Sequence, residues 1–400
     1  MNDSAMIDLL KRMQRRGVVV AVVGGVLALI GLFFDRSQFF QSYLMAYLFL
    51  LGLSLGSLAL LFVYYLTGGR WGFMLRRVFE AVAVGSGLLL LLALPLFFGL
   101  SDLYSWAQPA RVAADPLLQH KEPYLNIPFF VVRNGIYFIV WVGATFLLLR
   151  WSGQQDRTPQ DAYILAERMR YFSGPALALY GLTITFAAMD WLMSLEPHWF
   201  STIFGAMIGA TQVVAGIAFS TIVLIRLAPH DGELDGVVDE HLDDLGKMTL
   251  AFALFWAYMS FMQYLIIWAG NLPEEVVWYL RRLRHGWQWV ALLVLLCHFV
   301  LPFAALLSGR IRKRRRSLTM VAASIVGSDL LFYWWLVAPV FHPTLHLHWL
   351  DVVLPFALGA LWIALLSWQL RRRPLLARHD PVRATLAGRT TVLKEVLAHE

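Results

Sequence analysis

Length, composition and charge together place this chain in a membrane. Its 400 residues are 59% hydrophobic and only 15% charged, with a mean hydropathy of +0.63, so it lacks the polar surface that would enclose a soluble core of this size. The single cysteine, Cys297, excludes an intramolecular disulfide, a Cys-ligated iron–sulfur cluster and a Cys₄ zinc site. The net charge of +7 comes from short basic blocks between apolar runs, which indicates membrane topology and no nucleic-acid partner.

Ten apolar runs have the length of a membrane-spanning helix, which needs roughly 20 mainly apolar residues. In chain order they are 17–34, 39–66, 78–100, 127–150, 171–195, 199–227, 248–271, 287–308, 318–341 and 350–370. The first follows a basic stretch as a signal peptide does, but it is long and ends at Asp35 without a small-residue cleavage site, so we expect it to be retained. The predicted fold class is therefore an all-α integral membrane protein with about ten transmembrane helices.

A weak internal repeat divides these spans into two halves. Spans five and nine each carry an acid, Asp190 and Asp329, and each ends in a turn that contains proline and histidine. We therefore predict two four-helix bundles, spans 2–5 and spans 6–9, with spans 1 and 10 at their flanks. The corresponding segments are 1–38, 39–198, 199–345 and 346–400. Small residues at helical spacing, such as Gly52 and Gly56, predict close packing between helices.

The distribution of basic residues predicts the orientation. With both termini on the inner side, 26 of the 33 Lys and Arg residues lie on inner segments, six on outer segments and one, Arg133, inside a span. The strongest marker is the basic run from Arg310 to Arg316. We expect the acidic segment 229–247 to be an inner loop, although topology does not require its acidity. The polar tail after Arg373 is compatible with disorder or with docking on a partner.

Ionisable residues inside spans are the main functional candidates, because charge is costly in a bilayer. His298 and Asp329 each lie about 16 Å from the start of their spans, near the membrane midplane, at 1.5 Å per residue. Because the two spans are consecutive and antiparallel, we expect these side chains to meet. Pro302 lacks the amide that would bond the His298 carbonyl, which predicts a free carbonyl and a kink.

Further charged groups lie nearer the two membrane surfaces. Glu80 lies just inside span three, where Arg76 or Arg77 can neutralise it. Arg133 and Asp190 face the outer side, where they form either a structural ion pair or part of a functional site. With Asp190, Glu196 and His198 offer acid and base groups that quinol chemistry would need.

These groups at three depths form a ladder suited to proton transfer across the bilayer. The predicted proton-pathway residues are Glu80, Asp190, Glu196, His298 and Asp329. The supporting polar residues are Arg133, His198, Gln263, Tyr264, Ser324 and Tyr333. Each also has a purely structural interpretation, as an ion pair or an interhelical hydrogen bond.

Histidine placement argues against a haem or metal in this chain. Ten of the eleven histidines map to loops, helix ends or tails, so a bis-histidine haem b between spans is not expected. His342, His346 and His348 share one outer loop but lack an acidic or cysteine partner beyond Asp351. We therefore predict no metal site, no cofactor-binding residue and no catalytic residue.

Two long sequence strings resemble a known family. They are Asp190-Trp-Leu-Met-Ser-Leu-Glu-Pro-His-Trp-Phe-Ser-Thr202, and His241-Leu-Asp-Asp-Leu-Gly-Lys247 with the following Phe255–Trp268 and Asn271–Glu275 stretches. They resemble the ActF family of membrane subunits of alternative complex III, in the polysulfide-reductase/NrfD-like superfamily. The similarity covers most of the chain, apart from the N-terminus and the last thirty residues.

The resemblance implies a cofactor-free membrane subunit of a bacterial quinol:electron-acceptor oxidoreductase that transfers electrons to a cytochrome c-type acceptor. Its expected partners are a second, homologous membrane subunit of the same complex, an iron–sulfur subunit, c-type haem subunits and lipids. Haem c and iron–sulfur clusters would reside in those partners, and proton conduction, with a possible contribution to quinone or quinol binding, would be the role of this chain. The expected location is the bacterial inner (cytoplasmic) membrane, with both termini cytoplasmic.

Two other functions fit the same residues. A proton-coupled secondary transporter shares the buried ionisable groups and the internal repeat. A structural anchor for outer redox subunits would use every buried charge as an ion pair.

Overall fold

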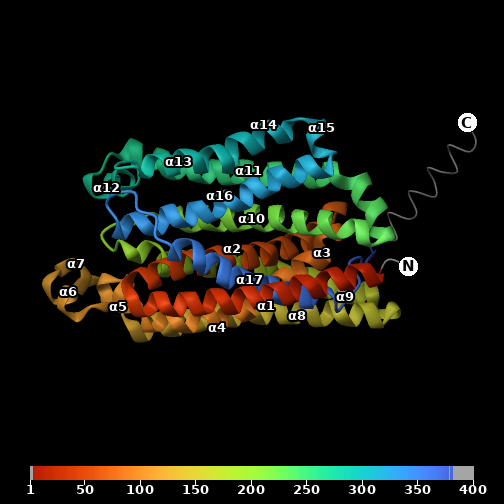
Figure 1. Cartoon of the computed structure of the whole chain (residues 1–400), viewed down its shortest axis with the longest axis horizontal. Helices are drawn as coiled ribbons and strands as arrows, with labels where there is room; N and C mark the ends of the chain where they lie inside the picture. Colours follow the sequence, from red (N-terminus) through yellow and green to blue (C-terminus); the bar gives the residue numbers. More distant parts are fainter. Residues whose placement is uncertain (1–2, 378, 382–400) are drawn as a thin grey trace, which may run out of the picture.

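The computed structural model describes residues 3–377 and 379–381, and over this part the chain is an all-α membrane protein (Figure 1). The helices are α1 (Asp3–Phe34), α2 (Arg36–Thr67), α3 (Arg70–Ala83), α4 (Gly85–Phe98), α5 (Leu100–Leu103), α6 (Pro109–Ala114), α7 (Pro116–Lys121), α8 (Ile127–Arg157), α9 (Ala162–Trp191), α10 (Phe204–Leu227), α11 (Gly232–Gly270), α12 (Pro273–Arg282), α13 (Trp287–Val294), α14 (Leu301–Leu307), α15 (Gly309–Arg312), α16 (Arg315–Phe341) and α17 (Leu350–Leu370). Short turns are η1 (Ser105–Ala107), η2 (Pro159–Asp161), η3 (Met193–Leu195), η4 (Ala228–His230) and the π-helical η5 (Leu295–Val300).

Within the described ranges, ten helical segments are long and apolar enough to cross a membrane, which confirms the ten predicted spans. They are Ala5–Phe34, Arg36–Thr67, Arg70–Phe98, Ile127–Arg157, Pro159–Leu195, Phe204–His230, Leu234–Gly270, Trp287–Leu307, Arg315–Phe341 and Leu350–Leu370. Most extend past the apolar runs, because flanking polar residues continue the helix beyond the hydrocarbon region.

The second span forms the centre of the bundle. Its most apolar window is 89% buried, and α2 packs against α10, the first helix of the second half. The contact has no room for side chains: a Cβ added to Gly56 would overlap the Gln212 carbonyl, and one added to Gly216 would lie 2.9 Å from the carbonyl carbon of Gly56. The close packing predicted from Gly52 and Gly56 is thus confirmed. The division into two bundles remains a prediction, and the structure joins both halves through α2 and α10.

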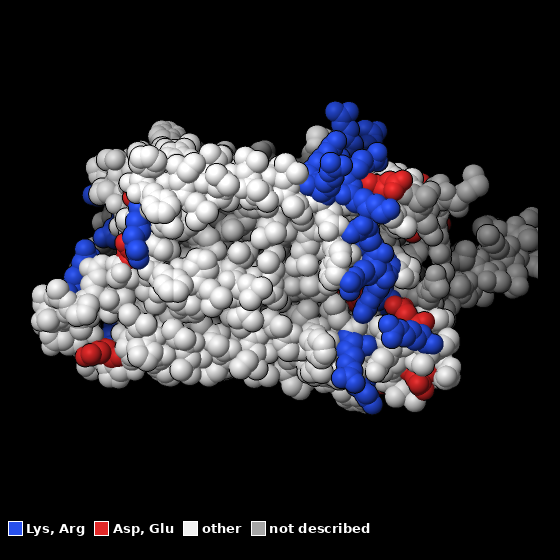
Figure 2. Space-filling model, turned by 60° about the horizontal axis from the view of Figure 1, so that its bottom comes forward, with Lys and Arg blue, Asp and Glu red and all other residues white. Residues whose placement is uncertain are grey.

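The two ends of the bundle differ in charge. One end, which we call the basic end, carries the N-terminus and the Arg310–Arg316 run, and Figure 2 shows a belt of Lys and Arg there beside a wide uncharged band. The other, which we call the loop end, carries α5, α6, α7 and α12 (Figure 1). This separation is the structural basis of the charge bias seen in the sequence.

The acidic segment 229–247 is not a loop, and this prediction was wrong. Beyond η4 it belongs to α11, which runs unbroken from Gly232 into the membrane. Its acids pair with the basic run: Arg312 contacts Asp243 at 2.7 Å, and Arg315 contacts Asp235 at 2.5 Å and Asp239 at 2.6 Å. The acidity therefore neutralises the connection between spans eight and nine.

The chain after α17 returns to the basic end of the bundle. Leu375, Leu376 and Ala377 are buried there, and the Asp380 carboxylate accepts hydrogen bonds from Arg76 at 2.6 Å and from Tyr64 at 2.7 Å. These residues pack on this chain itself, which is neither of the two interpretations left open for the tail. The rest of the predicted tail, 382–400, lies outside the described residues.

Candidate functional site

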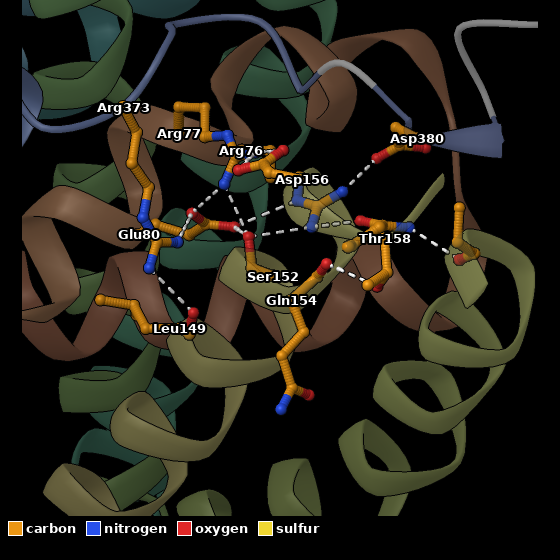
Figure 3. A network of polar contacts seen from close by, with 12 residues as sticks. Arg76, Arg77, Glu80, Leu149, Ser152, Gln154, Asp156, Thr158, Arg373 and Asp380 are labelled. Atoms are coloured by element: carbon orange, nitrogen blue, oxygen red, sulfur yellow. Dashed lines mark hydrogen bonds and ion pairs between the residues drawn. The ribbon is translucent and has the colours of Figure 1, made fainter. Parts of the chain in front are cut away.

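Glu80 lies in a buried polar network at the basic end (Figure 3). Its carboxylate contacts Arg76 Nε at 3.1 Å and Arg77 Nη1 at 2.8 Å, and it accepts a 2.6 Å hydrogen bond from Ser152 Oγ on α8. Arg373, from the chain after α17, approaches the same carboxylate at 3.5 Å. Both neighbouring arginines thus neutralise Glu80, whereas the sequence suggests one or the other.

The arginines of this network have further partners. Arg77 pairs with Asp156 at 2.5 Å, and Arg76 binds Gln155 at 2.8 Å as well as Asp380. The network therefore ties α3, α8 and the segment after α17 together. Such completely paired buried charges stabilise one arrangement of helices, because removing any partner leaves a charge uncompensated.

Arg133 and Asp190 form a bidentate ion pair between α8 and α9. Arg133 Nε and Nη2 lie 2.9 and 2.8 Å from the two Asp190 oxygens, and Tyr137 donates a further 2.8 Å hydrogen bond. The guanidinium also stacks over the Tyr124 ring, 3.8 Å from its centroid. Asp190 is completely buried, and its contacts are those of the structural ion pair that was one of the two alternatives for these residues.

Glu196 and His198 are engaged near the loop end. Glu196 pairs with Arg281 and Arg282, both at 2.6 Å, and His198 Nε2 lies 2.7 Å from Asp115. Burial lowers the pKa of Arg282, although the neighbouring Glu196 opposes that shift. Asp190, Glu196 and His198 therefore have separate partners instead of one shared acid–base site.

His298 lies within the π-helical turn η5, where the helix departs from α geometry, and the kink expected at Pro302 stays a prediction. The Leu301 amide donates to the Leu296 carbonyl, five residues back. In this register the amide absent from Pro302 would have bonded Cys297 and not His298. Ser324 on α16 donates to the Cys297 carbonyl at 2.7 Å. A side chain therefore satisfies the carbonyl that this register would leave without an amide, and a free His298 carbonyl stays a prediction.

The His298 ring is completely buried, with one nitrogen bonded and one without a partner. Nδ1 lies 3.2 Å from Ser328 Oγ, which itself lies 2.7 Å from the Ser324 carbonyl. These distances fit a chain in which Nδ1–H donates to Ser328 and Ser328 donates to Ser324. Nε2 has no hydrogen-bond partner among the described residues, and the ring packs against Trp256 with centroids 4.2 Å apart.

Asp329 does not meet His298, which corrects the prediction that they pair. Ser328 contacts His298, whereas both Asp329 oxygens are buried without a hydrogen-bond partner in the part of the chain that the structure describes. One helix position rotates a side chain by about 100°, so residues 328 and 329 face different neighbours. Equal depth along two packed helices therefore does not determine which of their side chains face each other.

Asp329 instead lies on the helix that carries Tyr333, which belongs to a polar cluster with Gln212 and Tyr180. Of these three, the sequence singled out only Tyr333. Tyr333 lies one turn further along α16, on the same face of the helix as Asp329. A Cβ at Gly52 would lie 2.9 Å from the Tyr333 hydroxyl and 3.4 Å from Gln212 Cγ, and Tyr180 donates to Gln212 Oε1 at 2.9 Å. The sequence analysis missed Tyr180 and Gln212. A glutamine in the apolar α10 span was the available signal.

The remaining supporting residues lie in different surroundings. Gln263 is buried and accepts a 2.6 Å hydrogen bond from Ser201, whereas Tyr264 is 41% exposed and packs edge-on against Tyr279. His342 Nε2 lies 2.9 Å from Gln38 Oε1, so this histidine at the loop end makes a polar contact with α2. Within the described ranges, no group of three or more His, Cys, Asp or Glu side chains is arranged to hold a metal ion.

The candidate site therefore has two parts of different chemistry. Glu80, Asp190 and Glu196 are ion-paired to arginines, which suits them to holding helices in place. His298 and Asp329 are buried in mid-span with titratable atoms that lack partners among the described residues, which suits them to accepting and releasing protons.

Comparison of the chain with models of known protein families and with curated protein sequences found no match.

Proposed function

We propose that this protein is a proton-conducting membrane subunit of a quinol:electron-acceptor oxidoreductase. One observation carries the proton-conduction part: His298 Nε2 and both Asp329 oxygens are buried in the bundle without hydrogen-bond partners among the described residues. A group that can hold a proton but is not committed to another side chain is free to exchange one. Partners with c-type haem and iron–sulfur clusters would carry the electrons.

Tyr333, Gln212 and Tyr180 extend this proposal across the bundle centre. They lie on α16, α10 and α9 around Gly52, and each has a hydroxyl or amide that can pass or accept a hydrogen bond. Water would bridge the intervals between these groups and Asp329. The proposed route is described only for the centre of the membrane. It does not require the ion pairs of Glu80, Asp190 or Glu196 with their arginines to break.

The charge bias supports an orientation for this protein. We place the basic end, with both termini, on the cytoplasmic side of a bacterial inner membrane, because Lys and Arg accumulate there. The loop end would then face the partners that hold c-type haem and iron–sulfur clusters. The homologous membrane partner would lie beside the bundle, and lipids would surround the remaining spans.

A second candidate function is that of a structural anchor for such partners. It is favoured by one specific observation: three of the five proposed proton-pathway residues are locked in ion pairs with arginines. The two functions differ in what His298 and Asp329 do, so variants at these two positions separate them.

The first experiment isolates the protein from its native membrane in a mild detergent and records the absorbance of haem c. We expect haem-bearing partners to copurify. A pure chain that carries out ion-coupled transport by itself would contradict the proposal and favour a secondary transporter.

The second experiment reconstitutes the isolated complex into vesicles and compares Asp329→Leu and His298→Leu with the parent. We expect quinol oxidation and assembly to persist while protons moved per electron fall by roughly tenfold, since the relay loses a titratable group. Ser220→Ala is the matched control, because Ser220 is also buried without a partner in the described structure but does not titrate. Unchanged proton movement in both leucine variants would leave only the anchor function.

A further inference from the structure

A cavity of about 560 Å³ lies between α11, α12, α13, η5 and α16. Its volume falls within the range of ligand-binding pockets, about 300–1,000 Å³. Aromatic side chains form much of its wall, including Trp256, Phe261, Trp278, Tyr279, Phe299 and Trp335. Along η5 and α13 the lining extends from Ala291 to Phe299, which is about 12 Å at the usual rise of a helix.

The cavity is open to the lipid-facing surface of the bundle. Phe261 and Leu295 line it and are 56% and 48% exposed, on two helices that span the membrane. A molecule that fills it therefore enters sideways from the bilayer. The end at mid-depth is closed by Trp256, Phe299 and Phe332.

The lining selects a hydrocarbon chain. None of the residues that line the cavity is a histidine, an acid, a lysine or an arginine, and Ser260 is the one aliphatic hydroxyl. His298 is completely buried and packs against Trp256, so this ring separates it from the cavity. A redox-active headgroup would need an acid or base within reach. An acyl chain needs none.

An exposed arginine follows a lining residue at the loop end. Leu283 lines the cavity, and the next residue, Arg284, is exposed without an ion pair among the described residues. Arg281 is also exposed, although Glu196 pairs with it. The acids of α12, Glu274 and Glu275, lie at the opposite end of that helix. The cavity thus combines an apolar interior with an exposed arginine that follows a lining residue at the loop end.

We propose that this cavity binds one acyl chain of an anionic phospholipid, with the phosphate held at Arg284. The apolar wall takes the chain, and the arginine supplies the charge that an anionic lipid prefers. This site is independent of proton transfer.

The test is native mass spectrometry of the purified full chain titrated with dioleoyl-phosphatidylglycerol or dioleoyl-phosphatidylcholine. In Ala257→Phe/Ala291→Phe, two alanines of the wall are enlarged to fill the cavity. The matched control Ala251→Phe/Ala269→Phe adds the same bulk at exposed positions outside the lining. We expect the cavity variant to lose tight phosphatidylglycerol binding by at least about tenfold and the control to retain it, with similar thermal unfolding of both.

Arg284→Gln tests the headgroup contact separately. It should weaken phosphatidylglycerol binding by about fivefold, the factor expected for one basic residue near an anionic surface, and leave phosphatidylcholine binding unchanged. Equal lipid binding by the cavity variant and its control would overturn the proposal. A second result would also overturn it: organic extraction of the wild-type protein yields a quinone and no phospholipid, and extraction of the cavity variant yields no quinone.

Discussion

Arg133 and Asp190 illustrate, at the scale of single residues, how this protein keeps charge inside its bundle. Two hydrogen bonds join their side chains, and Tyr137 and the Tyr124 ring occupy the remaining faces. Removing two ions from water is costly, and their mutual attraction offsets this only with complete pairing. The pair is therefore more important for the position of α8 against α9 than for net stability.

A double-mutant cycle tests this interpretation. Arg133→Met and Asp190→Leu alone should each destabilise the protein by about 3–5 kcal/mol, because each leaves an unpaired buried charge. The double variant should be close to wild type, since two apolar side chains replace the pair. Thermal unfolding in detergent, followed by circular dichroism, measures all three. Additive losses in the double variant would contradict the ion-pair interpretation.

His298 and Asp329 show a different use of buried polar groups. Ser328 holds one ring nitrogen of His298, and the other nitrogen and the Asp329 oxygens are left unbonded in the described structure. Other buried atoms of the described residues also lack partners, mostly hydroxyls, indoles and guanidinium nitrogens, but Asp329 is the one carboxylate among them. An unbonded buried carboxylate calls for an explanation in function or in bound water. This contrast with the paired carboxylates is the reason that the proton-transfer proposal rests on these two residues.

At the scale of helices, close backbone approach decides the architecture. Gly56 of α2 and Gly216 of α10 meet without side chains between them, and the Gln212 carbonyl occupies the space where a Gly56 Cβ would lie. In lipid, helix association depends on such packing because the apolar solvent provides no hydrophobic drive. The same approach holds Gln212 beside Tyr333 and Tyr180.

Gly56→Ala should therefore separate the two central helices. We expect a loss of at least about 1–3 kcal/mol, the usual cost of overpacking, and a shift in any property that depends on the Gln212 cluster. Gly87→Ala on α4 is the control, because no heavy atom lies within 4 Å of its added Cβ. Alanine there should be neutral or stabilising by about 0.4–1 kcal/mol. Equal stability of the two variants in a thermal unfolding assay would refute tight α2–α10 packing.

At the scale of the whole molecule, the segment after α17 closes the basic end. Asp380 binds Arg76, Arg373 approaches Glu80, and Leu375 and Leu376 are buried between them and the bundle. Residues more than 300 positions apart in sequence thus share one network (Figure 3). The first helix, in contrast, is only 22% buried in its most apolar window and packs chiefly along α17.

Asp380→Asn tests the contribution of this closure. The substitution should destabilise the protein by about 1.5–3 kcal/mol, the range for hydrogen bonds to charged groups, because the buried Arg76 loses an ionised partner. Glu167→Gln serves as the control, since its 3.5 Å ion pair joins a half-buried glutamate to an exposed Arg170, which predicts less than about 1 kcal/mol. Chemical unfolding of both variants in the same detergent provides the comparison. If Glu167→Gln lowered the free energy of unfolding as much as Asp380→Asn does, the contact between Asp380 and Arg76 would have no particular importance for stability.

Length and hydropathy were enough to establish the ten spans, and the distribution of Lys and Arg indicated the basic end. They suffice because a helix that crosses hydrocarbon must satisfy its backbone internally and expose apolar side chains to lipid. Hydropathy also misled at one place: the acidic run 232–247 is polar yet helical, because its acids meet Arg312 and Arg315. Such ion pairs leave no mark in a hydropathy profile.

Which side chains face each other became known only from the folded bundle. Depth placed Asp329 level with His298, but rotation about the helix axis brought Ser328 to the histidine and placed Asp329 on the same helix face as Tyr333. In η5 the Cys297 carbonyl takes its hydrogen bond from Ser324, and the chain after α17 brings Asp380 to Arg76. Helix rotation and long-range contact depend on packing between elements distant in sequence, so a periodic pattern within one span cannot specify them.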